Sequence, residues 1–259
     1  MTTWVLLRGL TREARHWADM AEQLRASGLE GDIVSADLPG TGVHWRVRSP
    51  ANVPALVDFV RADLHSRGYA PPFRVVALSL GAMVALAWAQ REPSEIERLV
   101  LINTSMRPFN RPFMRLQPRA LPELLCAALN WRSRRDAETA IHHLTCNRRD
   151  MRDTDLAKWI AIYRSAPVSR PNALRQLWSA ARFKANAAPP QCPVLVLSSQ
   201  RDALVHPGCS SAIADVWHAQ HRQHPWAGHD LPHDDPVWLA SSIAGWAAAL
   251  TGENTASRG

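Results

Sequence analysis

The sequence contains no apolar run approaching the ~18 residues that a membrane span needs, so we expect no membrane-embedded segment. It has few cysteines, and the four present, at positions 126, 146, 192 and 209, form no Cys-x-x-Cys pair. This scatter favours free thiols in a reducing compartment over a disulfide scaffold. The N-terminal stretch has neither a basic n-region nor a small-residue cleavage site. We therefore expect a cytoplasmic protein.

Lysine is also scarce: of the 30 basic residues, only Lys158 and Lys184 are lysines, and the formal net charge is +7. Such a charge can indicate an anionic partner. The sequence, however, shows no helix-turn-helix, RNA-recognition or zinc-knuckle signature, so we do not expect nucleic-acid binding. A hydrophobic share of 46% over 259 residues argues against disorder and predicts one or two domains with a well-buried core.

Short apolar segments alternate with helical patterns at both ends of the chain. Strands are expected at residues 4–8, 33–37, 73–78, 99–103, 194–197 and, more weakly, 222–226. Helices are expected at 12–27, 53–66, 81–90 and 236–250. Continuous apolar strands that alternate with helices predict a mostly parallel sheet of about six strands with helices on both faces.

The alternation stops between residues 105 and 186, where helical patterns occur without a convincing strand. We predict a core formed by residues 1–104 and 187–259 and a helical cap formed by residues 105–186. An insertion after the fourth strand places the cap over the carboxyl edge of the sheet, where open α/β sheets bind ligands.

The segment from Ala77 to Gly81, with sequence ALSLG, carries the strongest chemical signal. It joins the third predicted strand directly to the following helix. A serine in such a sharp turn projects its hydroxyl away from the backbone, provided that the residues two before and two after it are small. Ala77 and Gly81 satisfy this condition, which makes Ser79 a candidate nucleophile.

This pentapeptide resembles the nucleophile elbow of the α/β-hydrolase family, with alanine in place of the usual first glycine. The family order is Ser, then acid, then His. Residues 198–207 resemble the family's acid loop and contain Asp202, and residues 227–236 resemble its Gly-His motif and contain His229. The resemblance implies a triad in which His229 takes the proton of Ser79 while Asp202 orients the imidazole.

Neighbouring titratable residues have simpler interpretations, although His233, one turn beyond His229, remains an alternative base. We expect Asp230 and Asp234 to be first-turn or capping carboxylates. No metal ion is expected at either of two suggestive groups, His218, His221 and His224, or His142, His143 and Cys146.

An oxyanion hole needs two backbone N–H donors. The resemblance places them at Leu80, after the nucleophile, and at Leu10, in the loop after the first strand. Family members usually have His-Gly where this sequence has Arg8-Gly9. Arg8 either braces the loop through hydrogen bonds to carbonyls or binds a substrate carboxylate or phosphate.

The function that these residues imply is hydrolysis of a carboxylic ester through an acyl-enzyme, without a cofactor. A serine at the elbow disfavours the branches of the family that use an aspartate nucleophile, and the first two antiparallel strands of the family are missing. Chain size and the basic cap are similar to those of pimeloyl-acyl-carrier-protein methyl ester esterases and small thioesterases.

Lactonase and C–C bond hydrolase activities use the same triad, and a binding protein with little turnover is an alternative of another class. We expect a small acyl ester as substrate, either free or carrier-linked, and a monomer or homodimer.

The positive charge is concentrated in the predicted cap. Residues 105–186 contain 16 basic and 6 acidic residues, a net charge of +10, whereas the rest of the chain has a net charge of −3. Either this is an ordinary solvated helical face, or the cap steers an anionic substrate or an acidic carrier towards Ser79.

Overall fold

A computed structural model describes residues 2–256, with side chains up to residue 251. Its centre is a six-stranded sheet in the order β2-β1-β3-β4-β5-β6, and every pairing is parallel. The strands are β1 (Thr3–Leu7), β2 (Asp32–Ala36), β3 (Phe73–Leu78), β4 (Ile96–Ile102), β5 (Val194–Ser199) and β6 (Gln220–His224). The predicted sheet is confirmed, with the last strand two residues earlier than expected.

Alternate residues of each central strand enter two separate hydrophobic cores. In β3, for example, Val75 and Ala77 pack on one face of the sheet, and Val76 and Leu78 on the other. The first face is covered by α2 (Val53–Ser66), α3 (Leu80–Arg91) and α9 (Gly208–Trp217), and the second by α1 (Met20–Ala26) and α11 (Pro236–Ala256). Because both faces are buried, the central strands β1, β3, β4 and β5 are mostly apolar, as the sequence indicated, whereas the edge strand β6 is polar.

The single helix predicted over residues 12–27 is wrong in one respect. The chain forms a short 3-10 helix, η1 (Ala14–Trp17), and begins α1 only at Met20. Ala18 between them has φ 50°, which a continuous right-handed helix does not permit. The apolar spacing nevertheless places Trp17, Met20 and Leu24 in the same core.

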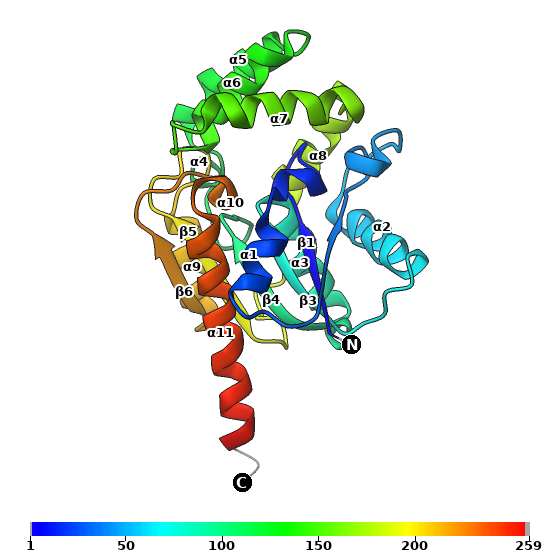
Figure 1. The fold of residues 1–259 in the computed structure, drawn as a ribbon, viewed down its shortest axis with the longest axis vertical. Helices are drawn as coiled ribbons and strands as arrows, with labels where there is room; N and C mark the ends of the chain where they lie inside the picture. Colours follow the sequence, from blue (N-terminus) through cyan, green and yellow to red (C-terminus); the bar gives the residue numbers. More distant parts are fainter. Residues whose placement is uncertain (1, 257–259) are drawn as a thin grey trace.

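Five α-helices and one short 3-10 helix lie between β4 and β5, in the segment predicted as a cap. They are α4 (Pro112–Arg115), the 3-10 helix η4 (Pro118–Ala120), α5 (Leu121–Leu129), α6 (Arg134–Thr145), α7 (Arg152–Ser165) and α8 (Arg170–Arg182). Figure 1 shows α5, α6 and α7 beyond the end of the sheet where the strands terminate. The two ends of this insertion lie side by side, because Arg107 and Lys184 form an isolated β-bridge. We keep the name cap for residues 105–186.

The strand order reverses between β1 and β3, since the chain adds β2 on one side of β1 and then β3 on the other. The loops that follow β1 and β3 diverge at such a point and leave a crevice at the carboxyl edge of the sheet. Arg8 to Thr11 follow β1 and Ser79 follows β3, so the fold brings the predicted oxyanion loop and nucleophile to this crevice.

Candidate active site

Ser79 occupies a sharp turn between β3 and α3. Its backbone has φ 57° and ψ −116°, which is a costly conformation for a residue with a Cβ. The surrounding structure holds this turn in place: the Ser79 amide donates to the carbonyl oxygen of Ile102 at 2.9 Å, and the Thr104 hydroxyl donates to the Ser79 carbonyl at 3.0 Å. The half-buried serine therefore has the strained geometry expected of a nucleophile elbow.

The loops on either side of the elbow approach so closely that two glycines are required. A Cβ on Gly81 would lie 2.6 Å from the carbonyl oxygens of both Leu7 and Arg8. A Cβ on Gly9 would lie 3.0 Å from the Cβ of Ser79. The small residue predicted at position 81 is thus needed because the end of β1 passes directly against the start of α3.

His229 and Asp202 form a buried pair. His229 Nδ1 lies 2.7 Å from Asp202 Oδ2, and both side chains are at least 94% buried. The other carboxylate oxygen of Asp202 accepts hydrogen bonds from the amides of Leu204 and Val205, at 2.8 and 2.9 Å. These bonds fix the carboxylate so that it can hold one tautomer of the imidazole.

Two consecutive residues at the end of β4 place the serine and the histidine. Ile102 accepts the Ser79 amide, and the side-chain amide of Asn103 donates to the carbonyl oxygen of His229 at 2.8 Å. Asn103 itself has φ 44°, a conformation that asparagine tolerates better than most residues. The sequence analysis missed Asn103; an asparagine directly after an apolar strand was the available signal.

The two backbone amides predicted for the oxyanion hole are free to donate to a ligand. Within residues 2–256, neither the Leu10 nor the Leu80 backbone N–H donates to a protein acceptor. The next amide, that of Thr11, donates to the side-chain oxygen of Gln176 at 2.9 Å, and Gln176 donates in turn to the carbonyl of Pro39 at 3.2 Å. A buried glutamine on α8 thus ties the oxyanion loop to the cap, a contact that no sequence motif indicated.

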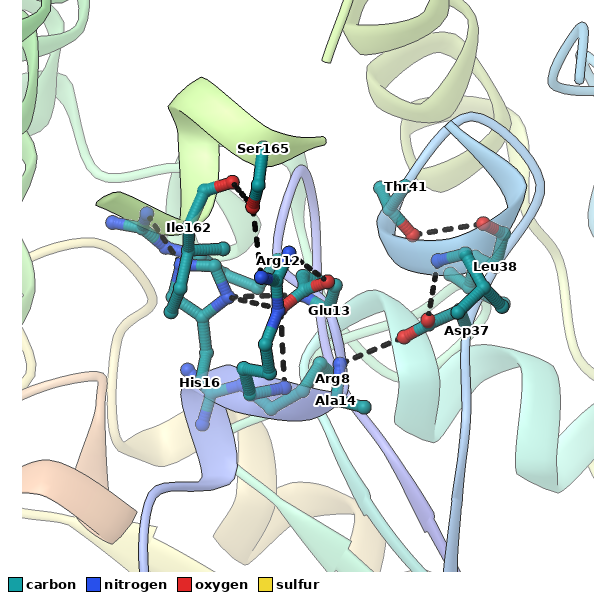
Figure 2. Close-up of polar contacts among 12 residues, drawn as sticks. Arg8, Arg12, Glu13, Ala14, His16, Asp37, Leu38, Thr41, Ile162 and Ser165 are labelled. Atoms are coloured by element: carbon teal, nitrogen blue, oxygen red, sulfur yellow. Dashed lines mark hydrogen bonds and ion pairs between the residues drawn. The ribbon is translucent and has the colours of Figure 1, made fainter. Parts of the chain in front are cut away.

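The residues that follow the Leu10 loop are also hydrogen-bonded, both to the core and to the cap (Figure 2). Asp37 accepts hydrogen bonds from the amides of Ala14 and Val43, at 2.7 and 2.9 Å. From the cap side, Ser165 on α7 accepts a hydrogen bond from Arg15 at 2.8 Å. The loop that contains Leu10 is therefore held by both the core and the cap.

Arg8 is buried and forms a two-pronged ion pair with Asp230, the residue after His229. The two nitrogen–oxygen distances are 3.0 and 2.6 Å. Burial raises the pKa of the Asp230 carboxyl, but the charge and hydrogen bonds of Arg8, together with the nearby His233 and Arg12, outweigh this effect and the pKa falls to about 2. Because its guanidinium fork is occupied by Asp230, Arg8 braces the loop after β1 against the loop that contains His229, and the geometry does not support the predicted contact with a substrate. Asp230 is likewise a loop-bracing residue and makes no side-chain capping bond.

Asp234 lies in the first turn of α10 (Leu231–Asp234), as one of the two expectations had it, but its carboxylate does not cap that helix. It accepts the amides of Gly228, Asn147 and Arg148 at 2.6 to 3.0 Å. Burial raises the pKa of Asp234, against the effect of these three donors. The loop that contains His229 is consequently hydrogen-bonded, through Asp234, to the segment of the cap between α6 and α7.

Four of the other histidines named in the sequence analysis contact groups other than the Asp202–His229 pair. His233 lies 3.7 Å from Asp155 on α7, and His142 lies 3.3 Å from the same carboxylate. His221 bonds to Ser198 and His224 to Asp235. In the described part of the chain, no three His, Cys, Asp or Glu side chains are grouped as a metal site. All four cysteines are free thiols, as predicted. A search of the described helices finds none that is both long and apolar enough to cross a bilayer.

A parallel sheet with a strained serine turn after β3 and an Asp–His pair after β5 and β6 defines a protein with the α/β-hydrolase fold. The sequence matches the family model described as "Alpha/beta hydrolase family" over residues 4–242. This chain therefore belongs to the α/β-hydrolase family, and the predicted resemblance, fold class and hydrolase assignment are confirmed.

Relatives with assigned activities include esterases. The chain is 28% identical over 215 residues to a pimeloyl-[acyl-carrier protein] methyl ester esterase from Chromobacterium violaceum, covering 82% of this chain and 80% of that protein. A thermophilic esterase from Thermogutta terrifontis has a similar structure, with a TM-score of 0.73, 23% identity and coverage of 96% and 90%. An enol-lactonase from Burkholderia xenovorans gives a TM-score of 0.71, 18% identity and coverage of 97% and 91%. These two structures share the fold with this chain.

Proposed function

We propose that this protein hydrolyses carboxylic esters through an acyl-enzyme on Ser79. The observation that carries the proposal is the strained turn at Ser79 on the same sheet edge as the buried His229–Asp202 pair. Ile102, the last residue of β4, and Asn103, the residue after it, hold the serine and the histidine, which supports their acting together.

In the proposed reaction, His229 removes the proton of Ser79 as the hydroxyl oxygen attacks the acyl carbonyl. The amides of Leu10 and Leu80 donate to the oxyanion that forms, and Asp202 stabilises the imidazolium. His229 then protonates the departing alcohol. A water molecule, deprotonated by His229, attacks the acyl-enzyme and releases the carboxylic acid, which restores Ser79.

The decisive experiment compares wild type with the Ser79→Ala variant on p-nitrophenyl esters of increasing acyl length. We expect kcat/KM to fall by at least ~10³-fold, because the serine forms the covalent intermediate. Ser66→Ala is the matched control, since Ser66 is exposed at the end of α2 and its hydroxyl, among the described residues, bonds only to the Asp63 carbonyl. Undiminished turnover by the Ser79→Ala variant would refute the proposal.

A carrier-linked ester is the second candidate substrate. Two observations favour it: the relative from Chromobacterium violaceum acts on an ester attached to an acyl carrier protein, and the cap has a net charge of +10. Carrier-linked and free methyl esters of the same acid should be compared at low and high salt. A preference for the carrier form that weakens with salt would support it, because screening reduces charge steering.

Thioester, lactone and C–C substrates belong in the same panel, since each would use the same triad. Labelling with a fluorophosphonate probe separates all of these enzymes from a non-catalytic binding protein. We expect the probe to modify Ser79, and an unmodified Ser79 would favour the binding protein.

A further inference from the structure

A cavity of about 600 Å³ lies in the seam between the cap and the core, and it is lined by none of the proposed catalytic residues. Its walls come from α7, from the turn between η1 and α1, and from the segment that begins at Pro232. This volume is typical of a pocket for a small organic ligand.

The walls of the cavity are apolar in the middle. Met151, Trp159, Ile162, Pro232 and Pro236 supply hydrocarbon and aromatic surface from both the cap and the core. Such a lining favours a ligand with an aliphatic or aromatic body, because that body leaves water when it binds.

Two cations at this cavity have no carboxylate partner among the described residues. Arg148 and Lys158 both line it, and neither forms an ion pair there. Other arginines of the same seam are paired: Arg8 with Asp230, and Arg12 with Glu138. The wall also contains two acidic residues: Asp155, which is held by His142 and His233, and the exposed Asp19, which accepts a hydrogen bond from Gln23. Neither carboxylate pairs with Arg148 or Lys158, so these two cations are free to meet an anionic group at the cavity.

Buried polar atoms without partners occur in the same walls. Arg148 Nε and Trp159 Nε1, both donors, and His233 Nε2, whose role depends on the tautomer, are buried and make no hydrogen bond to the described residues. Buried polar groups are nearly always satisfied, so three unsatisfied ones around one cavity require an explanation. An anionic ligand with its attendant water molecules would supply the missing partners.

We propose that this cavity is a second binding site, which takes a small organic anion with an apolar body, such as a medium-chain carboxylate. Arg148 and Lys158 would meet the anionic group, and the half-buried Met151 and Ile162 would contact the chain. The ligand would then touch the cap at α7 and the core at Pro232, three residues beyond His229, and hold these two parts together.

Titration calorimetry with octanoate, octan-1-ol and inorganic phosphate tests the proposal. Wild type should bind octanoate, and octan-1-ol and phosphate should each bind at least about tenfold more weakly, because each lacks one of the two features. Equal binding of octan-1-ol would contradict recognition of the anion. Equal binding of phosphate would contradict recognition of the chain. No heat from octanoate up to millimolar concentration would overturn the proposal.

Variants locate the site and separate it from Ser79. Arg148→Met with Lys158→Met removes both charges but keeps the aliphatic stems, and should weaken octanoate binding by at least about tenfold. Arg152→Met with Arg164→Met is the matched control, because it removes two charges from α7 outside the cavity and should bind like wild type. Ser79→Ala should also bind like wild type. Unchanged octanoate affinity in the Arg148/Lys158 variant would overturn the proposal, whatever the outcome of the ester assays.

Discussion

At the scale of single residues, the geometry of the elbow depends on two residues without side chains, Gly9 and Gly81. The start of α3 lies against the end of β1, and the carbonyl oxygens of Leu7 and Arg8 occupy the space that a Cβ at position 81 would need. The turn that exposes Ser79 and the loop that contains Leu10 are thus built as one unit.

Gly81→Ala should therefore damage both folding and activity. We expect it to lower the free energy of unfolding by about 1–3 kcal/mol through overpacking and to reduce kcat, measured by urea denaturation and ester assay. Gly245→Ala is the control, because a Cβ there meets nothing closer than 3.8 Å in the middle of α11. The control should be stabilised by about 0.5–1 kcal/mol. Equal effects at the two positions would contradict the close approach.

The Arg8–Asp230 pair predicts a specific acid sensitivity. The folded-state pKa of Asp230 is lowered to about 2. Its contribution to stability is therefore present above the unfolded pKa near ~4 and is lost as pH falls from there towards 2. Urea unfolding of wild type and of an Arg8→Met, Asp230→Asn double variant at pH 5, 4 and 3 measures the difference.

The stability gap between these two proteins should narrow as the pH falls. A gap that stays constant from pH 5 to pH 3 would mean that the pair does not titrate as described. Arg8→Met alone should be destabilised by about 3–5 kcal/mol at pH 7, because it leaves Asp230 buried and charged.

At the scale of elements, α8 is joined to the oxyanion loop by one buried side chain. Gln176 accepts from the Thr11 amide and donates to the Pro39 carbonyl, so it links the cap to the loops after both β1 and β2. Thr11 has φ 57°, and the glutamine helps to hold that unusual backbone.

Gln176→Ala should cost about 1–3 kcal/mol of unfolding free energy, since it leaves buried backbone groups without partners. It should also lower kcat more than it raises KM if the loop positions the Leu10 amide. Leu177→Ala, on the exposed face of the same helix, should change stability by no more than ~0.5 kcal/mol. A Gln176 variant with an unaltered kcat would show that α8 does not support the oxyanion loop.

The elements that the sequence predicted best are those whose apolar pattern is enforced by burial on two faces. The strands around Val75 and Leu101 are examples. The break at Ala18 was not predictable, because the spacing of Trp17, Met20 and Leu24 fits both a continuous helix and two shorter pieces.

For the site, the motifs identified Ser79, Asp202 and His229. The contacts of Asn103, Gln176 and Asp234 depend on residues far apart in the sequence, which no local spacing reveals.

At the scale of the whole molecule, charge is divided unequally between the two parts. The cap has a net charge of +10 above a core with a net charge of −3, yet much of the seam between them consists of paired charges such as Arg12–Glu138. The excess positive charge is therefore carried on the outer surface of the cap and at the cavity described above.

Charge reversal of exposed cap residues tests whether this surface steers substrates. Replacing Arg149, Arg152 and Arg164 by Glu lowers the cap charge from +10 to +4. We expect KM for an anionic or carrier-linked ester to rise several-fold at low salt and to return towards wild type at high salt. KM for a neutral p-nitrophenyl ester is the internal control and should not change. The same KM for both ester types would show that the cap surface is only a solvated face.

The bridge between Arg107 and Lys184 has a consequence for how this enzyme could diversify. Because the chain leaves the sheet and returns to it at neighbouring backbone positions, the intervening helices can be exchanged without altering the path of β4 or β5. Such an exchange would have to preserve the side chains by which the inserted segment holds the loops of the core, such as Gln176 at Thr11 and Gln117 at the carbonyl of Asp202. The covering of this sheet edge can therefore change while the framework of strands is kept.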